Sequence, residues 1–509
     1  MKKVSIVIIL LSILVRYDFV YSQEISSGKE HNMAGKIIYE IFTQSFYDTN
    51  GDSIGDLNGI TMKLDYLKDL GVDGIWLMPI HPSPSYHKYD VINYYDIHPD
   101  YGTKEDFRHL VEEAHKRGIV VLIDLVANHT SSEHPWFIHA SSSKNNRYRN
   151  YYVWTDDTIE VKKDPNNWYR ILNGSKLSDV YYYGFFTRRM PDLNYNESAV
   201  REEMIKIGEY WITEFGVDGY RLDAAKHIYP EDEIKKNHIW WQQFRNELDK
   251  KHPSVYLVGE IWDNDEIIGP YLSDGLHAAF NFKFSGMLSN NLIQEENKGL
   301  IDSLLYIYNT YNKYSKFYTD ALFLKNHDQT RIRTYLERIE KARLASSILL
   351  TLPGTIYLYY GEEIGMAGDK DHLNIREPML WDYPGKDNGQ TAWIKSKYSI
   401  PGIVEPVVDQ IRDKNSLLNH YKELIALRKQ YRHLQKGKLE KLDTGFPEIL
   451  SYTLTLDSTK LTIIHNLSLK NMEISIMEYS NKNIVWSDGK IRFDKNRLTL
   501  SGLSSVVLI

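Results

Sequence analysis

Acidic side chains lie at the ends of four short apolar runs, and their types and positions could support hydrolytic chemistry. The four positions are Asp124, Asp223, Glu260 and Asp328. Two carboxyl groups whose pKa values are pushed apart can cleave a glycosidic bond, one as nucleophile and the other as general acid. A separation of about 5 to 5.5 Å would make the reaction retain anomeric configuration through a covalent glycosyl-enzyme. The pattern therefore predicts a glycosidase-type site, provided that the fold brings these residues together.

Strand alternation suggests a different role for each carboxyl group. It places Arg221 and Asp223 on one face, where the guanidinium favours an ionised, nucleophilic Asp223. Glu260 follows Val258 on its own face, and apolar surroundings would raise its pKa toward that of a general acid. For Asp124 we expect a structural role, holding Arg221 in place. A purely structural ion-pair network is the alternative, but four buried charged strand ends would carry a large desolvation cost that barrel folding does not require.

Parallel strands are the elements that must position these residues. Between Lys36 and Tyr360, apolar strand-like runs alternate with amphipathic helical stretches such as Leu57–Leu70 and Lys104–Arg117, which is typical of a parallel sheet wrapped by helices. In an α/β barrel the chemistry sits at the carboxyl ends of the strands. We therefore predict a (β/α)8 TIM barrel. The eight predicted strands are Ile37–Phe42, Gly74–Met78, Val120–Val126, Gly219–Asp223, Tyr256–Glu260, Ala278–Phe282, Ala321–Lys325 and Thr355–Tyr360.

Two departures from the alternating pattern define further domains. A long segment rich in Ser, Asn, Trp and Tyr separates the third strand from the next helix, which predicts a small inserted domain over 128–192. The barrel would then comprise 36–127 and 193–431. Strands and polar turns over 432–509 predict a C-terminal antiparallel β-sandwich. Its predicted strands are Leu450–Leu456, Leu461–Asn466, Met472–Met477 and Arg497–Leu503.

Composition excludes several function classes. The 509 residues carry a formal net charge of -7, which offers no basic surface for a nucleic acid. Cysteine is absent, so disulfides and thiolate chemistry are excluded, and oxygen or His ligands remain for any metal. The 38 Tyr residues are an excess whose flat faces and hydroxyl tips suit sugar rings as well as half-buried packing. Those expected around the site are Tyr86, Tyr89, Tyr94, Tyr95, Tyr148, Tyr151, Tyr152, Tyr169 and Tyr181 to Tyr183.

The first residues are typical of a secretory signal peptide. Lys2 and Lys3 precede the apolar run Val4–Val15, and a small residue, Ser22, stands before Gln23. A membrane anchor needs roughly 18 or more apolar residues, and this run is shorter. We therefore predict a signal peptide over 1–22 and a secreted or periplasmic mature protein, monomeric and without a membrane anchor.

A loop after the first strand has the ligand chemistry of a Ca²⁺ site. Side chains with oxygen atoms stand at every second position from 48 to 56 except 54: they are Asp48, Asn50, Asp52 and Asp56. At position 54 the backbone carbonyl of Ile54 could supply the oxygen ligand. Hard oxygen ligands in a glycine-containing turn suit Ca²⁺. The alternative is a solvated acidic turn ahead of a helix, where carboxylates also favour the N-terminal dipole.

Five segments together resemble the short motifs of the α-amylase family, glycoside hydrolase family 13. The four main ones occur in that family's order, and the fifth resembles its signature near the end of the inserted domain. They are Asp124–His129, Gly219–His227, Val258–Trp262, Phe323–Asp328 and Met190–Asn194. The resemblance implies that Asp223 is the nucleophile and Glu260 the acid/base. Asp328 would be a third carboxylate that grips sugar hydroxyls and stabilises the transition state.

The same resemblance implies roles for sugar-binding residues. His129 and His327 would bind the sugar at the cleavage site, Arg221 would tune Asp223, and Tyr89 would be the ring on which that sugar stacks. Packing at the barrel mouth is the alternative for Tyr89. Relatives with this loop spacing bind Ca²⁺, which would be structural because the two-carboxylate mechanism needs no metal.

The substrate preference depends on a mixture of features. Lys226 and His227 resemble the starch-cleaving α-amylases, in which these residues meet the glucose units on the leaving-group side, and Met190 stands where oligo-1,6-glucosidases tend to have Gln. The segment at Arg376 instead resembles the oligosaccharide-cleaving branch, and would contact the non-reducing side. We expect a secreted α-glucan hydrolase that cleaves α-1,4 bonds of starch or maltooligosaccharides.

Three alternatives and one possible second ion stay open at this point. The enzyme alternatives are an oligo-1,6-glucosidase or neopullulanase type and a glucosyl-transferring enzyme of the same family. The third is a non-catalytic binding relative, which the intact set of Asp223, Glu260 and Asp328 disfavours. A second Ca²⁺, at Asn128 and the carbonyl of His227, is also possible in such proteins.

Overall fold

A computed structural model describes residues 31–173, 176–369, 371–475, 483–494 and 497–509. The predicted signal peptide, 1–22, lies outside the described residues. Within those ranges, none of the helices combines the length and the apolar character needed to cross a bilayer.

Eight parallel strands form the barrel, as predicted. Neighbouring strands pair in the order β10-β11-β1-β2-β3-β7-β8-β9, and a parallel bridge between Phe280 and Ala321 joins the two ends of the sheet. The predicted sixth strand is shorter than expected, because the Asn281 side chain accepts a hydrogen bond from Phe284 N and begins a helix there. The barrel strands are β1 (Ile37–Ile41), β2 (Gly74–Leu77), β3 (Val120–Leu125), β7 (Gly219–Leu222), β8 (Tyr256–Gly259), β9 (Ala278–Ala279), β10 (Ala321–Phe323) and β11 (Thr355–Tyr359).

Side-chain alternation along these strands separates an interior core from a helix-facing core. Large side chains fill the interior, and they include Ile38, Trp76, Leu122, Val258, Phe280, Phe323 and Tyr357. Two residues farther along three of the strands, the same face carries Glu40, Asp124 and Glu260. The interior therefore changes from apolar to charged toward the carboxyl ends of the strands, where barrel chemistry is expected.

Helices surround this sheet, and the signals at their ends explain their limits. The capping box of Thr103 and Asp106 begins α4, and Gly118, with a φ of 71°, follows its end. The predicted helix over 57–70 is instead two helices, because Lys63 leaves helical geometry at φ −96° and ψ 3°. The helices around the barrel are α1 (Thr43–Phe46), α2 (Leu57–Met62), α3 (Leu64–Leu70), α4 (Lys104–Lys116), α7 (Ser198–Phe215), α8 (Ile234–Asp249), α9 (Asp265–Ile268), α10 (Phe282–Gln294), α11 (Leu300–Tyr311), α12 (Ile332–Leu336), α13 (Ile339–Thr351), α14 (Val407–Gln410), α15 (Leu417–Gln430) and α16 (His433–Lys436).

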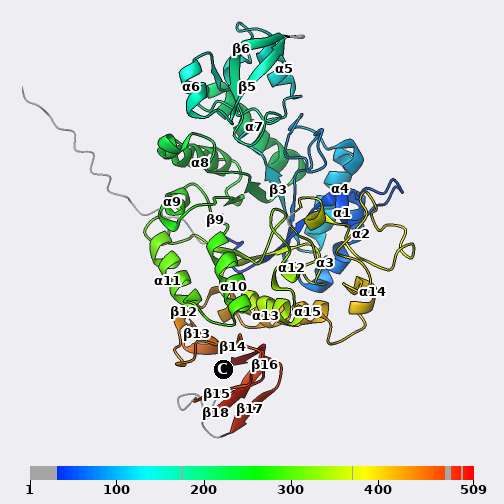
Figure 1. The fold of residues 1–509 in the computed structure, drawn as a ribbon, viewed down its shortest axis with the longest axis vertical. Coiled ribbons are helices and arrows are strands. Elements are labelled where there is room, and N and C mark those ends of the chain that lie inside the picture. Colours follow the sequence, from blue (N-terminus) through cyan, green and yellow to red (C-terminus); the bar gives the residue numbers. More distant parts are fainter. Residues whose placement is uncertain (1–30, 174–175, 370, 476–482, 495–496) are drawn as a thin grey trace, which may run out of the picture.

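The segment inserted between β3 and α7 folds as a small unit at one end of the molecule (Figure 1). Its sheet has the order β4-β6-β5, from β4 (Trp154–Thr155), β5 (Trp168–Asn173) and β6 (Lys176–Tyr183), with α5 (Pro135–Ser142) and α6 (Thr158–Lys163) beside it. Aromatic packing forms its core, where the rings of Phe137 and Trp154 stack at 5.7 Å. The expected inserted domain is therefore present.

The chain ends in antiparallel sheets at the opposite end of the molecule (Figure 1). One sheet has the order β12-β13-β14-β19-β16 and the other β15-β18-β17. The expected C-terminal β domain is confirmed, but the sequence pattern missed β12, β16, β17 and β19, several of which are short and mostly exposed. The strands are β12 (Lys438–Lys441), β13 (Ile449–Leu456), β14 (Thr459–Asn466), β15 (Met472–Ser475), β16 (Ile484–Asp488), β17 (Ile491–Asp494), β18 (Arg497–Leu500) and β19 (Ser504–Leu508).

Candidate active site

The Arg221 guanidinium connects three carboxyl groups at the carboxyl ends of neighbouring strands. Its Nη1 donates to both oxygens of Asp124, at 2.8 and 3.0 Å, and to Asp223 Oδ1 at 2.7 Å. Its Nη2 donates to Glu260 Oε2. Asp124 is completely buried, which agrees with the predicted structural role of holding Arg221. Asp223 and Glu260 are thus bonded to the two terminal nitrogens of one planar group, and this places them side by side.

Both predicted catalytic carboxyls accept hydrogen bonds from Arg221. Burial raises the pKa of Glu260, although Arg221 opposes the shift. Asp223 accepts its hydrogen bond from Nη1 of this guanidinium and lines the cavity. Immediately after Asp223, Ala224 adopts a left-handed backbone with a φ of 45° and turns the chain toward the cavity rim.

Asp328 lies in a second charged cluster. It contacts Arg376 Nη2 at 2.9 Å and His327 Nε2 at 3.1 Å, while His327 Nδ1 contacts Glu40. Burial alone would lower the pKa of His327, but Asp328 and Glu40 raise it to about 10. Burial also opposes ionisation of Asp328, yet His327 and Arg376 hold its pKa well below the ordinary value. Asp328 is therefore an anion and His327 a cation near neutral pH.

Tyr89 links the two clusters. Its hydroxyl lies 3.1 Å from Asp124 Oδ2 and 2.7 Å from His327 Nε2, and its ring stacks on the His327 ring at 5.5 Å. His129 Nε2 lies 3.2 Å from the carbonyl oxygen of Tyr89, and burial lowers the pKa of His129. The other ring nitrogen of His129, Nδ1, lies 3.3 Å from Asn128 Nδ2, so both nitrogens have protein partners. Tyr89 presents an aromatic face beside the carboxylates.

Most of the predicted site residues open into one cavity of about 820 Å³. Arg221 and His327 lie beneath it and act through the residues they contact. The volume falls within the range of small-molecule sites. The residues that line it are Tyr86, His87, Tyr89, His129, Phe186, Thr187, Met190, Asp223, Glu260, Trp262, Asp328, His372, Leu373 and Arg376.

Lys226 and His227 lie outside the residues lining this cavity, beside its rim. Lys226 Nζ donates to Asp263 at 2.9 Å, and the His227 ring stacks on Phe185 with centroids 4.1 Å apart. Sequence reasoning missed Trp262 as a site residue, although its ring is 58% exposed at the cavity and is backed by Phe282 at 4.6 Å. An exposed aromatic ring supported from behind is suited to stacking against a sugar.

Several of the tyrosines expected around the site have structural roles instead. Tyr86 and Tyr89 line the cavity, as expected. Tyr94 is buried, and its hydroxyl donates to the carbonyl oxygens of Val126 and His129, so it supports the loop after β3. Tyr152 and Tyr182 pack in the core of the inserted unit. The expectation that these tyrosines map sugar subsites is therefore wrong for the last three.

The predicted Ca²⁺ loop lies on the barrel surface between α1 and α2, outside the catalytic cavity. Asp48 accepts hydrogen bonds from three backbone N–H groups, and Asp56 caps α2 through Gly59 N at 2.7 Å. Both carboxylates are buried, and within the described part of the chain no cationic side chain pairs with either. Those residues also contain no group of three or more acidic or His side chains arranged for a metal. A cation would therefore need the Asn50 oxygen and the Ile54 carbonyl as well.

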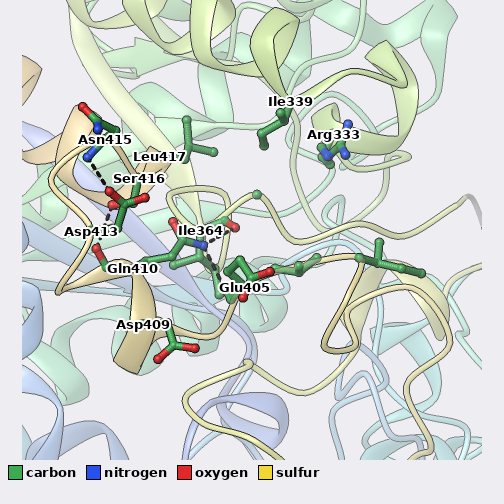
Figure 2. Close-up of a pocket in the computed structure, with 13 residues that line it drawn as sticks. Arg333, Ile339, Ile364, Glu405, Asp409, Gln410, Asp413, Asn415, Ser416 and Leu417 are labelled. Carbon is green, nitrogen blue, oxygen red and sulfur yellow. Dashed lines mark hydrogen bonds between the residues drawn. The ribbon is translucent and has the colours of Figure 1, made fainter.

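A second cavity, of about 480 Å³, contains none of the predicted site residues (Figure 2). It lies where α13, α14 and the start of α15 meet, and Gln410 crosses it to donate to the carbonyl oxygens of Ile364 and Glu405. Its apolar wall of Ile339 and Leu417 faces acidic side chains. No described residue of the charged clusters reaches it, so the chemistry is concentrated in the larger cavity.

Comparisons with known proteins agree with this geometry. A family model described as the α-amylase catalytic domain matches residues 40–437. "Alpha-amylase 3" of Dictyoglomus thermophilum is 45% identical, covering 93% of this chain and 92% of the relative. An oligo-1,6-glucosidase of Parageobacillus thermoglucosidasius is 33% identical, with 85% and 90% covered. The crystal structure of an α-amylase from H. orenii aligns with a TM-score of 0.84 at 42% identity, covering 94% of this chain and 99% of that one.

The cluster around His327 predicts a specific pH dependence of stability. Because the folded-state pKa is about 10, above the ordinary 6.5, its contribution is complete below about pH 6.5 and is lost as pH rises through 10. Glu40→Gln removes one neighbouring anion and should lower that pKa. We expect the variant's free energy of unfolding, measured by urea denaturation, to fall less steeply than wild type between pH 7 and 10. If the free energy of unfolding fell equally steeply with pH in the two proteins, the raised pKa of His327 would be contradicted.

Proposed function

Because this chain belongs to the α-amylase family of glycoside hydrolases, we propose that it hydrolyses α-1,4-glucosidic bonds of starch or maltooligosaccharides with retention of configuration. The observation that carries the proposal is the shared guanidinium: Asp223 and Glu260 bond to the two terminal nitrogens of Arg221 and face one cavity with Asp328. This arrangement provides the adjacent carboxyl pair that a retaining mechanism needs.

The reaction would proceed in two displacements. Asp223 attacks the anomeric carbon while Glu260 donates its proton to the departing glycosidic oxygen, giving a glycosyl-enzyme and a free chain end. Glu260, now ionised, then takes a proton from water, and the oxygen of that water displaces Asp223 from the same carbon. Both residues return to their starting protonation states, and the product keeps its configuration.

The groups around the pair would bind the sugar at the cleavage site. Arg376 and His327 hold Asp328 anionic. Asp328 would accept hydrogen bonds from sugar hydroxyls and stabilise positive charge in the transition state. His129 would line this part of the site, and Tyr89 and Trp262 would present stacking faces. These residues surround the carboxyl pair on several sides of the cavity.

The α-1,4 preference rests on the resemblance of Lys226 and His227 to the starch-cleaving α-amylases. Both residues lie at the rim, where the leaving-group sugars would lie. An oligo-1,6-glucosidase activity is the second candidate, because relatives of that name are 31 to 33% identical over 85 to 87% of this chain, and the segment at Arg376 resembles that branch. A glucosyl transferase would use the same intermediate, with a sugar hydroxyl in place of water.

The roles of the two carboxyls can be separated with a substrate whose leaving group needs no proton. We expect Glu260→Gln to lower kcat on maltopentaose by about 10²- to 10⁴-fold but to retain the first step on α-maltosyl fluoride. Asp223→Asn should lose activity on both substrates, since no nucleophile remains. Initial rates of fluoride release from α-maltosyl fluoride and of sugar release from maltopentaose measure the two activities. An Asp223→Asn enzyme that still hydrolyses starch would refute the assignment of Asp223 as the nucleophile.

The products distinguish the three activities. We expect soluble starch and maltoheptaose to give shorter maltooligosaccharides, measured by chromatography, with little release of glucose from isomaltose. Dominant cleavage of isomaltose would instead support the oligo-1,6-glucosidase candidate. Products longer than maltoheptaose would support the transferase. Asp223→Asn protein, purified in the same way, controls for contaminating amylases.

We also propose that the loop of Asp48, Asn50, Asp52, Ile54 and Asp56 binds one structural Ca²⁺. Two buried carboxylates without a cationic partner among the described side chains support this, as does the chemistry of five oxygen donors. The loop is also packed closely on α1, since a Cβ at Gly55 would come within 2.0 Å of the carbonyl oxygen of Thr43. The ion would neutralise the loop without entering the reaction.

Removal of the ion should destabilise the protein. When free Ca²⁺ is about 100 times its Kd, linkage predicts about 2.7 kcal/mol of stabilisation, seen as a lower Tm after chelation. Asp52→Asn should reduce the Tm shift between chelator and Ca²⁺. Asp156→Asn, an exposed carboxylate on the inserted unit, should leave it unchanged. A wild-type Tm that chelator does not alter would refute the site.

A further inference from the structure

The ring of His227 is held differently from the other histidines near the carboxylates. His129 and His327 both have ring nitrogens in hydrogen bonds or ion pairs with the protein. Among the described residues, no hydrogen bond to the His227 ring nitrogens is present, although its backbone N–H donates to Ala224 at 2.9 Å. The backbone is therefore fixed while packing alone orients the ring.

That packing comes from two adjacent phenylalanines of the inserted unit. The Phe185 ring stacks on His227 at 4.1 Å between centroids and 28° between planes. Phe186 meets His227 edge-on at 6.0 Å and His129 at 5.2 Å. Burial, then Lys226, lower the pKa of His227 to about 4, so the stacked ring is neutral near pH 7. It keeps one N–H donor and one nitrogen acceptor for a ligand.

The turn that carries Phe185 is fixed within the inserted unit. Phe185 N donates to Asp192 Oδ1 at 3.0 Å, and Gly184 N donates to Asn167 at 2.9 Å. A Cβ at Gly184 would come within 2.8 Å of the carbonyl oxygen of Thr187, so the turn closes tightly around this glycine. Phe185 is thus a rigid surface, although its side chain is 37% exposed.

From these contacts we propose that Phe185 is a positioning residue for the acceptor side of the cavity, the side that holds the leaving-group or attacking sugar. By stacking on His227, it fixes the direction in which the free ring nitrogens meet a sugar hydroxyl. The inference rests on the proposed α-glucan hydrolase function. Phe185 does not line the cavity itself. Through Phe185, the inserted unit would nevertheless influence how the acceptor sugar binds.

Two substrates isolate this role. Maltopentaose needs the acceptor side, whereas α-maltosyl fluoride leaves that side empty because its leaving group is fluoride. Phe185→Leu keeps an apolar side chain but removes the stacking face. We expect it to lower kcat/KM on maltopentaose about three- to tenfold, mainly through KM, from the usual strength of an aromatic pair. On α-maltosyl fluoride its kcat/KM should stay within about twofold of wild type. Phe185→Tyr, which keeps the ring, should match wild type on both.

Controls separate positioning from general damage. Phe446→Leu changes a similarly exposed ring on the C-terminal domain and should alter neither rate. His227→Ala and the double variant with Phe185→Leu should lose the same amount on maltopentaose, because Phe185 acts through His227.

Three results would overturn the inference: unchanged maltopentaose kinetics in Phe185→Leu, equal losses on both substrates, or additive losses in the double variant. A wild-type enzyme inactive on both substrates would instead refute the proposed function itself.

Discussion

One guanidinium shared by three carboxyl groups is the interaction on which the rest of the site depends. Arg221 is buried and bonds Asp124 below it and Asp223 and Glu260 on the cavity side. A planar fork fixes the directions of its partners, which a flexible ammonium group could not do. Losing one partner of such a group leaves a buried charge unpaired. The strand ends must therefore keep their register for the carboxyl pair to remain adjacent.

The same arrangement leaves fewer cations than carboxyl groups. Glu40, Asp124, Asp223, Glu260 and Asp328 are five acids within two connected clusters, and the cations beside them are Arg221, Arg376 and the His327 imidazolium. Complete ionisation would leave a net negative charge in a poorly solvated place. A proton on Asp124 or Glu260 reduces that cost, because burial raises the pKa of both groups. Of these two, Glu260 lines the cavity, so it is the one suited to be the acid. The charge balance and the division of catalytic labour have one physical origin.

Sequence patterns predicted the elements with strong local signals. All eight barrel strands were found because each is a short apolar run, and the acidic strand ends converge because parallel strands end at one mouth. Glu40 was missed because it lies inside a strand of otherwise buried residues, and only the fold brings it to His327. Phe185 and Trp262 were also missed, since their roles depend on contacts with distant residues. Tyr94 and Tyr152 were overinterpreted, because composition does not distinguish a packed ring from an exposed one.

The barrel is not equally strong around its circumference. Between β9 and β10 the ladder reduces to one bridge, Phe280 with Ala321, reinforced by Asn281 donating to both oxygens of Asp320. β8 and β9 share two paired positions, and every other neighbouring pair of barrel strands shares three or four. On heating, local opening of the barrel would therefore begin between β9 and β10. β10 leads into Asp328, whereas Asp223 and Glu260 follow β7 and β8, which pair with each other at four positions. An early opening would therefore misalign the third carboxylate while the other two stayed in place. Heat inactivation could then precede global unfolding.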